Sequence, residues 1–341
     1  MSEPVSPVVV TMGDPAGVGG DCLLKAWTEH RDSLSPFFVI DDPGRLGALA
    51  LQLKLDCSIQ TIARPDETHD HFAKALPVMP VDPPLSAPAK LGTPDSINAS
   101  AVIGAIDKAV TLVQDGHASS MVTNPIHKAS MQDAGFTHPG HTEYLGHLAG
   151  PGIQPVMMLA SAKVRGGLRV IPVTIHIAHA DAANALTTDA IVNHGTIVSA
   201  ALEQDFGVKS PRIAVAALNP HAGEDGKFGN EETRIITPAV NALQDKGINA
   251  FGPLPADTLF HTDARETADA VLCMYHDQAL IPLKTLDFYG GVNVTLGLPF
   301  VRTSPDHGTA FSLAGTGTAR CDSLVAAIRM AAEVAANRTP D

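Results

Sequence analysis

The sequence predicts an α/β protein with mostly parallel sheets. Short apolar runs rich in valine and isoleucine alternate along the chain with longer segments of helical periodicity, the pattern expected when helices connect successive parallel strands. Apolar residues make up 45% of the 341 residues and charged residues only 17%, so the chain can bury a large core and is not expected to be disordered. The length suggests about two domains or one large α/β unit.

The apolar runs and their flanking turn residues place the individual elements. Strands are predicted over residues 8–10, 37–40, 119–123, 168–174, 212–218 and 270–274. Helices are predicted over 22–27, 96–115 and 323–337, and a further helix is expected to open at Thr237-Pro238. Ser96 can cap the second of these helices and Gly116 can end it. The proline-rich stretch 66–93 is expected to be a long irregular connection.

Charge and cysteine usage exclude several classes of protein. With 23 basic and 36 acidic side chains the net charge is −13, so nucleic acid is not an expected partner. No apolar run reaches the ~18 residues of a spanning helix, and Met1-Ser2-Glu3-Pro4 does not open a signal peptide, so no membrane partner is expected. The four cysteines are far apart and form no C-x-x-C pair, which predicts free thiols in a reducing cytoplasm.

The sequence contains 15 histidines, an unusually large number, and histidine is the commonest metal ligand and a common proton-transfer group in proteins. Three predicted strands end close to a histidine, and these are His176, His221 and His276. Ligands of open α/β sheets bind beyond the carboxyl ends of the strands, where three imidazoles would fix a divalent cation and leave positions open for substrate. The alternative is that each is an ordinary loop histidine. His179 forms an H-x-x-H pair with His176 and is a competing ligand.

Three other polar stretches allow both a functional and a structural interpretation. The glycine-rich segment from Met12 to Gly20 could approach an anion at a helix N-terminus or could be a tight turn without a ligand. Gly140-His141-Thr142-Glu143 suits hydrogen bonding to a small polar substrate, or a helix capped by Thr142. The stretch 284–315 contains cations suited to a phosphorylated substrate, or to surface salt bridges.

These motifs, in this order, resemble the 4-hydroxythreonine-4-phosphate dehydrogenase family of vitamin B6 biosynthesis. The resemblance covers about residues 8 to 330. The matching segments are Gly13-Asp14-Pro15-Ala16-Gly17-Val18-Gly19, Thr123-Asn124-Pro125-Ile126-His127-Lys128, Gly140-His141-Thr142-Glu143, Leu218-Asn219-Pro220-His221-Ala222-Gly223-Glu224, the segment 252–258, Met274-Tyr275-His276-Asp277-Gln278, the segment 291–304 and Asp306-His307-Gly308-Thr309-Ala310.

The resemblance implies a two-domain α/β/α fold like that of isocitrate and isopropylmalate dehydrogenases. It implies an outer domain of residues 1–135 plus 286–341, and a central domain of residues 136–285 with the metal ligands and the dimer interface. It also implies a homodimer whose active sites lie at the subunit interface.

The resemblance also assigns roles to individual residues. The metal ligands would be His176, His221 and His276, with His276 of the partner subunit completing the site. Substrate contacts would fall on His141, Thr142, Lys284, Asn293 and Arg302. The nicotinamide cofactor would lie in the cleft, with Asp306, His307 and Gly308 as part of its site by analogy with the dehydrogenases that share the fold.

Two segments depart from the family pattern. Gly20-Asp21 stands where the family commonly has Pro-Glu or Pro-Asp, which puts the details of that loop in doubt. Ile177-Ala178-His179 replaces the usual Leu-Pro after the first histidine, which keeps His179 as a variant ligand.

The expected reaction is oxidation of 4-phosphooxy-L-threonine at C3 by NAD or NADP, followed by decarboxylation to 3-amino-2-oxopropyl phosphate. A divalent cation (zinc, magnesium, manganese or cobalt) would lower the pKa of the C3 hydroxyl, and Lys128 and Asp257 are the candidate bases. The rival substrates are a phosphorylated four-carbon sugar acid and a cis-dihydrodiol. A phosphate acyltransferase and a metal-storage protein are rivals from other classes.

Overall fold

The computed structural model describes residues 5–164 and 167–338, so Met1–Pro4, where no signal peptide was expected, lie outside the described residues. The chain forms two compact units. Unit 1 contains the described residues 5–153 and 298–336, and unit 2 contains 154–164, 167–297 and 337–338. The domain limits expected from the sequence, after residues 135 and 285, stay a prediction.

Unit 1 is built on a parallel sheet, as the sequence predicted. Its strand order is β3-β4-β2-β1-β5-β12, and each neighbouring pair in this order is parallel. The strands are β1 (Val8–Thr11), β2 (Phe37–Asp41), β3 (Ile59–Thr61), β4 (Leu76–Pro80), β5 (Ser120–Thr123) and β12 (Arg302–Pro305). In β1, β2, β5 and β12 every residue is buried, which explains why these strands read as continuous rather than alternating apolar runs.

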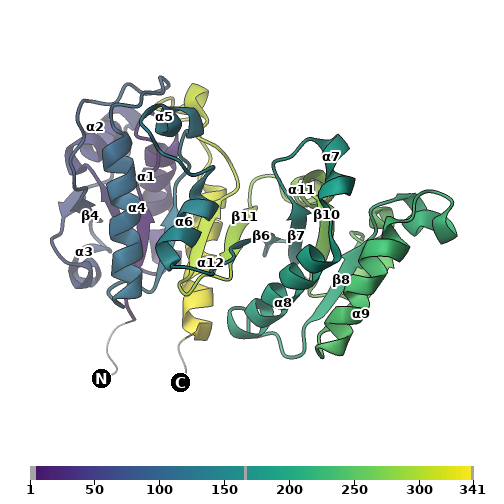
Figure 1. Ribbon diagram of the computed structural model, residues 1–341. Helices are drawn as coiled ribbons and strands as arrows, with labels where there is room; N and C mark the ends of the chain where they lie inside the picture. The colour runs from purple at the N-terminus through teal and green to yellow at the C-terminus, as the bar shows by residue number, and fades with distance from the viewer. Residues whose placement is uncertain (1–4, 165–166, 339–341) are drawn as a thin grey trace. The chain divides into compact units, whose positions relative to one another are not determined.

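Helices cover the sheet of unit 1. They are α1 (Gly19–His30), α2 (Pro43–Leu53), α3 (Thr68–His71), α4 (Ala99–Gln114), α5 (Lys128–Asp133), α6 (His141–Ala149) and most of α12 (Asp322–Arg338), with single 3₁₀ turns at Arg31–Ser33, Pro65–Glu67 and Phe311–Leu313. Figure 1 shows α4 lying along the strands of this unit. Its small buried residues, Ala101, Ala105 and Ala109, allow the close approach to the sheet.

Two predictions in unit 1 are wrong. Residues 66–93 are not wholly irregular, because Leu76–Pro80 form β4 between β3 and β2. The two prolines of this strand suggested a connection, but its first four residues are buried in the sheet. The helix expected from Ser96 begins at Ala99. The side chain of Asn98, next to it, bonds to the backbone of Ala87 instead of capping the helix.

Unit 2 contains a mixed sheet of order β11-β6-β7-β10-β8-β9. The strands are β6 (Val156–Ser161), β7 (Leu168–Thr174), β8 (Arg212–Ala216), β9 (Asn249–Leu254), β10 (Ala270–Tyr275) and β11 (Val292–Leu296). From β7 to β9 the neighbours are parallel, whereas β6 is antiparallel to both β7 and β11. Across both units the sheets are thus mostly parallel, and the α/β prediction is confirmed.

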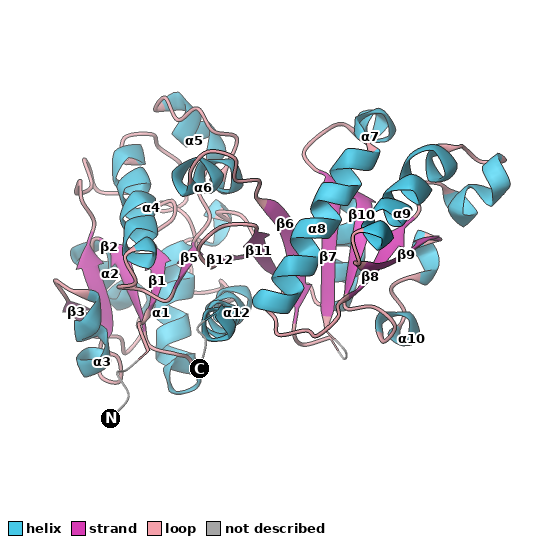
Figure 2. Cartoon of the chain, turned by 60° about the horizontal axis from the view of Figure 1, so that its bottom comes forward, coloured by secondary structure: helices cyan, strands magenta, loops and turns pink. Residues whose placement is uncertain are grey.

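The helices of unit 2 are α7 (His179–Ala185), α8 (Thr188–Gln204), α9 (Thr237–Asp245), α10 (Thr262–Arg265) and α11 (His276–Leu286), with short helical turns at Pro220–Gly226, Glu232–Ile236 and Ala256–Thr258. Figure 2 shows α8 lying across the strands of this sheet, with which it makes contact. Helix α9 begins at Thr237 with Pro238 in its first turn, as predicted, and it follows directly on the π-helical turn Glu232–Ile236. Among the described residues, no helix is long and apolar enough to cross a membrane.

Candidate active site

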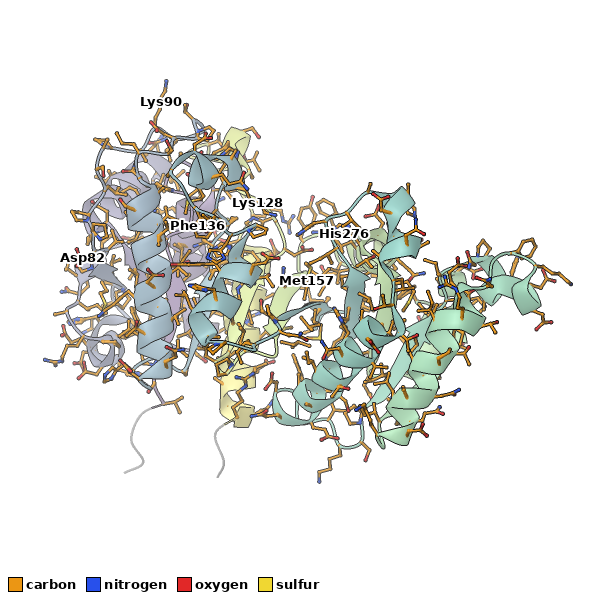
Figure 3. All side chains as sticks on the ribbon, viewed as in Figure 1. Asp82, Lys90, Lys128, Phe136, Met157 and His276 are labelled. Atoms are coloured by element: carbon orange, nitrogen blue, oxygen red, sulfur yellow. The ribbon has the colours of Figure 1, made fainter. Side chains whose placement is uncertain are left out.

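The three candidate metal-binding histidines follow neighbouring strands of unit 2. β7, β10 and β8 are adjacent and parallel, so their carboxyl ends lie at the same edge of the sheet, where ligands of α/β proteins bind. His176 lies two residues beyond β7, His276 opens α11 directly after β10, and His221 lies in the turn after β8. Figure 3 shows His276 at this edge of unit 2.

Two of these histidines share a cavity. The ring centroids of His176 and His276 are 6.1 Å apart, and both rings line a cavity of about 260 Å³ together with His179, Tyr275 and Asp277. Nδ1 of His276 lies 2.7 Å from Oδ1 of Asp277, and a carboxylate at this position fixes the imidazole so that Nε2 is presented to a ligand. Imidazole is a common ligand of divalent cations, although this cavity contains only two of the three candidate histidines.

His179, the competing ligand, opens α7 and lines the same cavity. Its ring stacks on that of Tyr275 at a centroid distance of 4.9 Å and an interplanar angle of 28°. This contact gives His179 a packing role whether or not it binds a cation.

The third histidine, His221, lies in an unusual backbone turn. The five residues His221–Asp225 all have positive φ between 42° and 78°, and only Gly223 among them is a glycine. His176 also has a positive φ, of 53°. Left-handed backbone costs roughly 1–2 kcal/mol per non-glycine residue, and such strain concentrates at functional sites.

The three histidines do not complete a metal site within one chain. Among the described residues, the group that brings three metal-binding atoms within 4.8 Å of one another is Glu29, His30 and Cys321, in unit 1. The expectation placed His276 of the partner subunit at the site, and a single chain does not test this. The assignment of His176, His221 and His276 therefore stays a prediction.

A buried cation lies in unit 1. Arg302, the first residue of β12, is only 3% exposed. Its Nη2 and Nε donate to Oγ1 of Thr123 at 2.6 and 3.2 Å. Burial lowers the pKa of Arg302 to about 10, although the carboxylate of Glu143 acts in the opposite direction. The guanidinium is still protonated at neutral pH and provides a positive charge for an anionic group.

His141 lies in the electrostatic field of this cation. Burial, together with the positive charges of Arg302 and Lys128, lowers the pKa of His141 to about 3, so its ring is neutral at pH 7. Its Nε2 is buried and has no hydrogen-bond partner among the described residues. A neutral imidazole nitrogen next to two cations can bond a polar group of a substrate.

The helix that contains His141 is not capped in the way that the sequence suggested. Helix α6 begins at His141, and its N-cap is Gly140 without a side-chain cap bond. The alternative in which Thr142 caps the helix is therefore wrong. Lys128, labelled in Figure 3, opens α5, and its Nζ would lie 3.7 Å from a Cβ atom added at Gly140.

The glycine-rich segment after β1 packs against other loops of unit 1. Gly13 has a φ of +67°, and a Cβ atom there would lie 2.7 Å from that of Asn124. A Cβ atom at Gly17 would lie 3.0 Å from the carbonyl oxygen of Thr309, which accepts a hydrogen bond from the amide of Val18. These close backbone contacts are sufficient reason for glycine at positions 13 and 17, and no bound anion is needed to account for them. They favour the interpretation of this segment as a tight turn.

The segment proposed for the cofactor follows β12. The amide of Asp306 donates to Oγ of Ser323, and Nδ1 of His307 lies 2.9 Å from the carbonyl oxygen of Gly308. A Cβ atom at Gly308 would meet nothing within 4 Å, so the backbone there faces open space. The neighbouring Thr309 joins this segment to the glycine-rich turn.

The remaining predicted site residues belong to unit 2. Lys284, on α11, holds its Nζ 5.3 Å from the ring centroid of Phe288. Asn293, on β11, has a buried Oδ1 without a hydrogen-bond partner among the described residues. Asp257 is exposed in the 3₁₀ turn Ala256–Thr258.

Sequence reasoning did not single out Thr123, Asp277 or Glu232. Thr123 and Asp277 lie inside the matching motifs, but only the structure shows that they bond to Arg302 and His276. Glu232 lies 11 positions after His221, and its carboxylate accepts backbone amides of the turn before that histidine. No local sequence pattern singles out Glu232, because the amides that it accepts belong to an earlier turn.

Comparisons with known proteins agree with the motifs. The profile of the family "Pyridoxal phosphate biosynthetic protein PdxA" matches residues 33–331. A 4-hydroxythreonine-4-phosphate dehydrogenase of Caulobacter vibrioides is 51% identical over 337 residues, which cover 97% of this chain and 98% of that protein.

Solved structures give the same result. The crystal structure of 4-hydroxythreonine-4-phosphate dehydrogenase from Klebsiella pneumoniae superposes with a TM-score of 0.84 at 36% identity and covers 97% of this chain and 99% of that one. A terephthalate 1,2-cis-dihydrodiol dehydrogenase from Burkholderia xenovorans, at 23% identity and a TM-score of 0.63 over 96% of this chain and 98% of that one, shares the fold. The chain therefore belongs to the PdxA family of pyridoxal phosphate biosynthetic proteins, the 4-hydroxythreonine-4-phosphate dehydrogenases that its motifs resemble.

Proposed function

We propose that this enzyme oxidises 4-phosphooxy-L-threonine at C3 with NAD or NADP and releases carbon dioxide, forming 3-amino-2-oxopropyl phosphate for pyridoxal phosphate biosynthesis. The C3 hydroxyl loses its proton to a base and C3 gives its hydride to the nicotinamide, which leaves a ketone β to the carboxylate. The bond from C2 to the carboxylate then breaks, and a proton adds to C2. The observation that carries this proposal is 51% identity over 337 residues to a dehydrogenase of this name, together with the two cations Arg302 and Lys128 that lie near His141 in unit 1.

These two cations suit a substrate with two anionic groups. Arg302 provides a buried guanidinium whose two bonds to Thr123 fix its plane, and Lys128 adds a second charge near His141. His141 remains neutral and can bond the substrate without repelling the two cations. Thr142 of unit 1, with Lys284 and Asn293 of unit 2, completes the proposed set of substrate-binding residues.

His176, His221 and His276 are the proposed ligands of a divalent cation. Zinc, magnesium, manganese and cobalt are the candidates. A cation held there supplies a Lewis acid, which lowers the pKa of a bound hydroxyl and stabilises an enolate. Asp277 orients the imidazole of His276, and Lys128 and Asp257 remain the candidate bases. The backbone of Asp306, His307 and Gly308 is proposed to contact the nicotinamide cofactor.

We also propose a homodimer in which His276 of the partner subunit completes each metal site. An exposed apolar surface on unit 2 supports self-association: Ile281, Phe288 and Tyr289, on and just after α11, are 64%, 63% and 51% exposed.

Subunit mixing tests this arrangement. The variants His221→Ala and His276→Ala are each expected to be inactive. A heterodimer of the two keeps one intact site if ligands come from both chains, so random mixing should restore about a quarter of the wild-type activity. If the three ligands come from one chain, mixing restores none.

The reaction itself is tested by the absorbance of NADH or NADPH. Purified protein with 4-phosphooxy-L-threonine should generate the reduced cofactor, and a chelator should abolish the signal. A panel with erythronate 4-phosphate, threonate 4-phosphate and a cis-dihydrodiol separates the rival substrates. Acyl transfer from phosphate without reduced cofactor would refute the proposal in favour of the acyltransferase.

A further inference from the structure

The backbone around His221 needs support from outside the turn. Five consecutive residues, His221–Asp225, are left-handed, and their side chains apart from Gly223 are not buried. His221 itself is exposed, and its ring has a loose contact with the half-exposed ring of Phe228, at a centroid distance of 6.2 Å, so side-chain packing gives it little support.

The carboxylate of Glu232 supplies this support. Its Oε1 accepts the backbone amides of Leu218 and Asn219 at 2.9 and 2.7 Å, and its Oε2 accepts the side-chain amide of Asn219 at 3.0 Å. The carboxylate thus fixes the residues that immediately precede Pro220-His221. Glu232 is only 5% exposed, so these bonds are shielded from water.

Two further features adapt the structure to this contact. Glu232 opens the π-helical turn that leads into α9, and π-helical turns are rare and frequent at functional sites. A Cβ atom at Gly223 would lie 2.7 Å from Oε2 of Glu232, so a larger residue there would displace the carboxylate. The π-helical turn thus places the carboxylate, and the glycine at position 223 leaves room for it.

We propose that Glu232 is a positioning residue, which holds the backbone before Pro220 by hydrogen bonds and packs against Gly223 after it, so that the imidazole of His221 is placed to bind the divalent cation. The inference rests on the proposed function, because it requires His221 to be a metal ligand. Outer residues that orient a metal ligand typically change metal affinity by 10–100-fold when they are replaced.

The test measures Co²⁺ binding by calorimetry to the full-length protein. Glu232→Gln keeps the size of the side chain and one acceptor oxygen, and we expect about tenfold weaker binding. Glu232→Ala removes every bond, and we expect about hundredfold weaker binding. Glu203→Gln, an exposed residue near the end of α8, makes the same charge change and should bind Co²⁺ like the wild type.

Two readouts distinguish positioning from a general loss of structure. Activity of the Glu232 variants should recover at high Co²⁺ concentration, with a raised half-saturating concentration, because only the placement of a ligand has changed. In the metal-free protein, hydrogen exchange should become faster at the amides of Leu218 and Asn219 in these variants and stay unchanged in α8.

The outcomes separate this inference from the proposed function. If Glu232→Ala folds and binds Co²⁺ as tightly as the wild type, the positioning role is refuted while the metal site stands. If Glu232→Ala does not fold, Glu232→Gln gives the answer by the same criterion. If His221→Ala binds Co²⁺ as tightly as the wild type, His221 is no ligand, and both the metal assignment and the role of Glu232 fail.

Discussion

Mild acid is expected to destabilise unit 1 through His141. Burial and two nearby cations lower the pKa of this histidine from 6.5 to about 3 in the folded protein. Between these two values the unfolded chain binds a proton at residue 141 that the folded chain does not. The contribution of His141 to the free energy of unfolding is therefore fully present above the unfolded pKa of 6.5. It is lost progressively as the pH falls from 6.5 towards the folded pKa.

The size of the effect follows from the number of protons. One proton bound only by the unfolded chain changes the free energy of unfolding by at most about 1.4 kcal/mol per pH unit. Over about 1.5 units, from near pH 6.5 to pH 5, the contribution of His141 is at most roughly 2 kcal/mol, and less because the residue as a whole is only half-buried. Wild type and His141→Gln contain the same other titrating groups, so the difference between them isolates this histidine.

Fluorescence of the single tryptophan provides the assay. Trp27 is 2% exposed in unit 1 and donates to the carbonyl oxygen of Phe72, so urea unfolding monitored at this residue reports on unit 1. The free energy of unfolding of the wild type should fall more steeply below pH 6.5 than that of His141→Gln. Equal slopes in the two proteins would refute the inference that His141 is neutral in the folded state.

Three further variants test contacts in the two units. Thr123→Val removes the acceptor of two Arg302 bonds and should lower the free energy of unfolding of unit 1 by about 1.5–3 kcal/mol; an unchanged urea midpoint would contradict this. Gly13→Ala should cost about 2 kcal/mol or more, because the residue has positive φ and lies against Asn124; equal thermal stability would show that the turn can shift. Asp277→Asn should weaken Zn²⁺ binding about 10–100-fold in a chelator competition, and unchanged affinity would show that the carboxylate does not orient its histidine.

Features that depend on residues close together in the sequence could be predicted. The strands before His176 and His276 are short buried runs of apolar residues, and a buried parallel strand reads as such a run whatever surrounds it. The placement of the three histidines at one edge followed from the rule that parallel strands end together. Family motifs then supplied roles that the residues alone left open.

Features that depend on distant contacts could not be predicted. Prolines at 77 and 80 indicated a loop, but β4 pairs with strands on both sides, and only the assembled sheet shows that their missing amides are tolerated. Asn98 has the residue type of a helix cap, but its side chain bonds to Ala87. Glu232 carries no local signal, since its importance arises from a turn that comes earlier in the chain.

The discontinuity of unit 1 has a consequence for synthesis of the protein. β12 pairs with β5, and Oγ1 of Thr303 in β12 donates to the carbonyl oxygen of Ala327 in α12, so both elements belong to the core of a unit that starts at the N-terminus. A nascent chain that has just passed residue 153 lacks both, and β5 is then an open edge able to pair with another chain. We expect this half-made unit to depend on chaperones until residues 298–336 have been made, and an isolated fragment ending at residue 153 to aggregate.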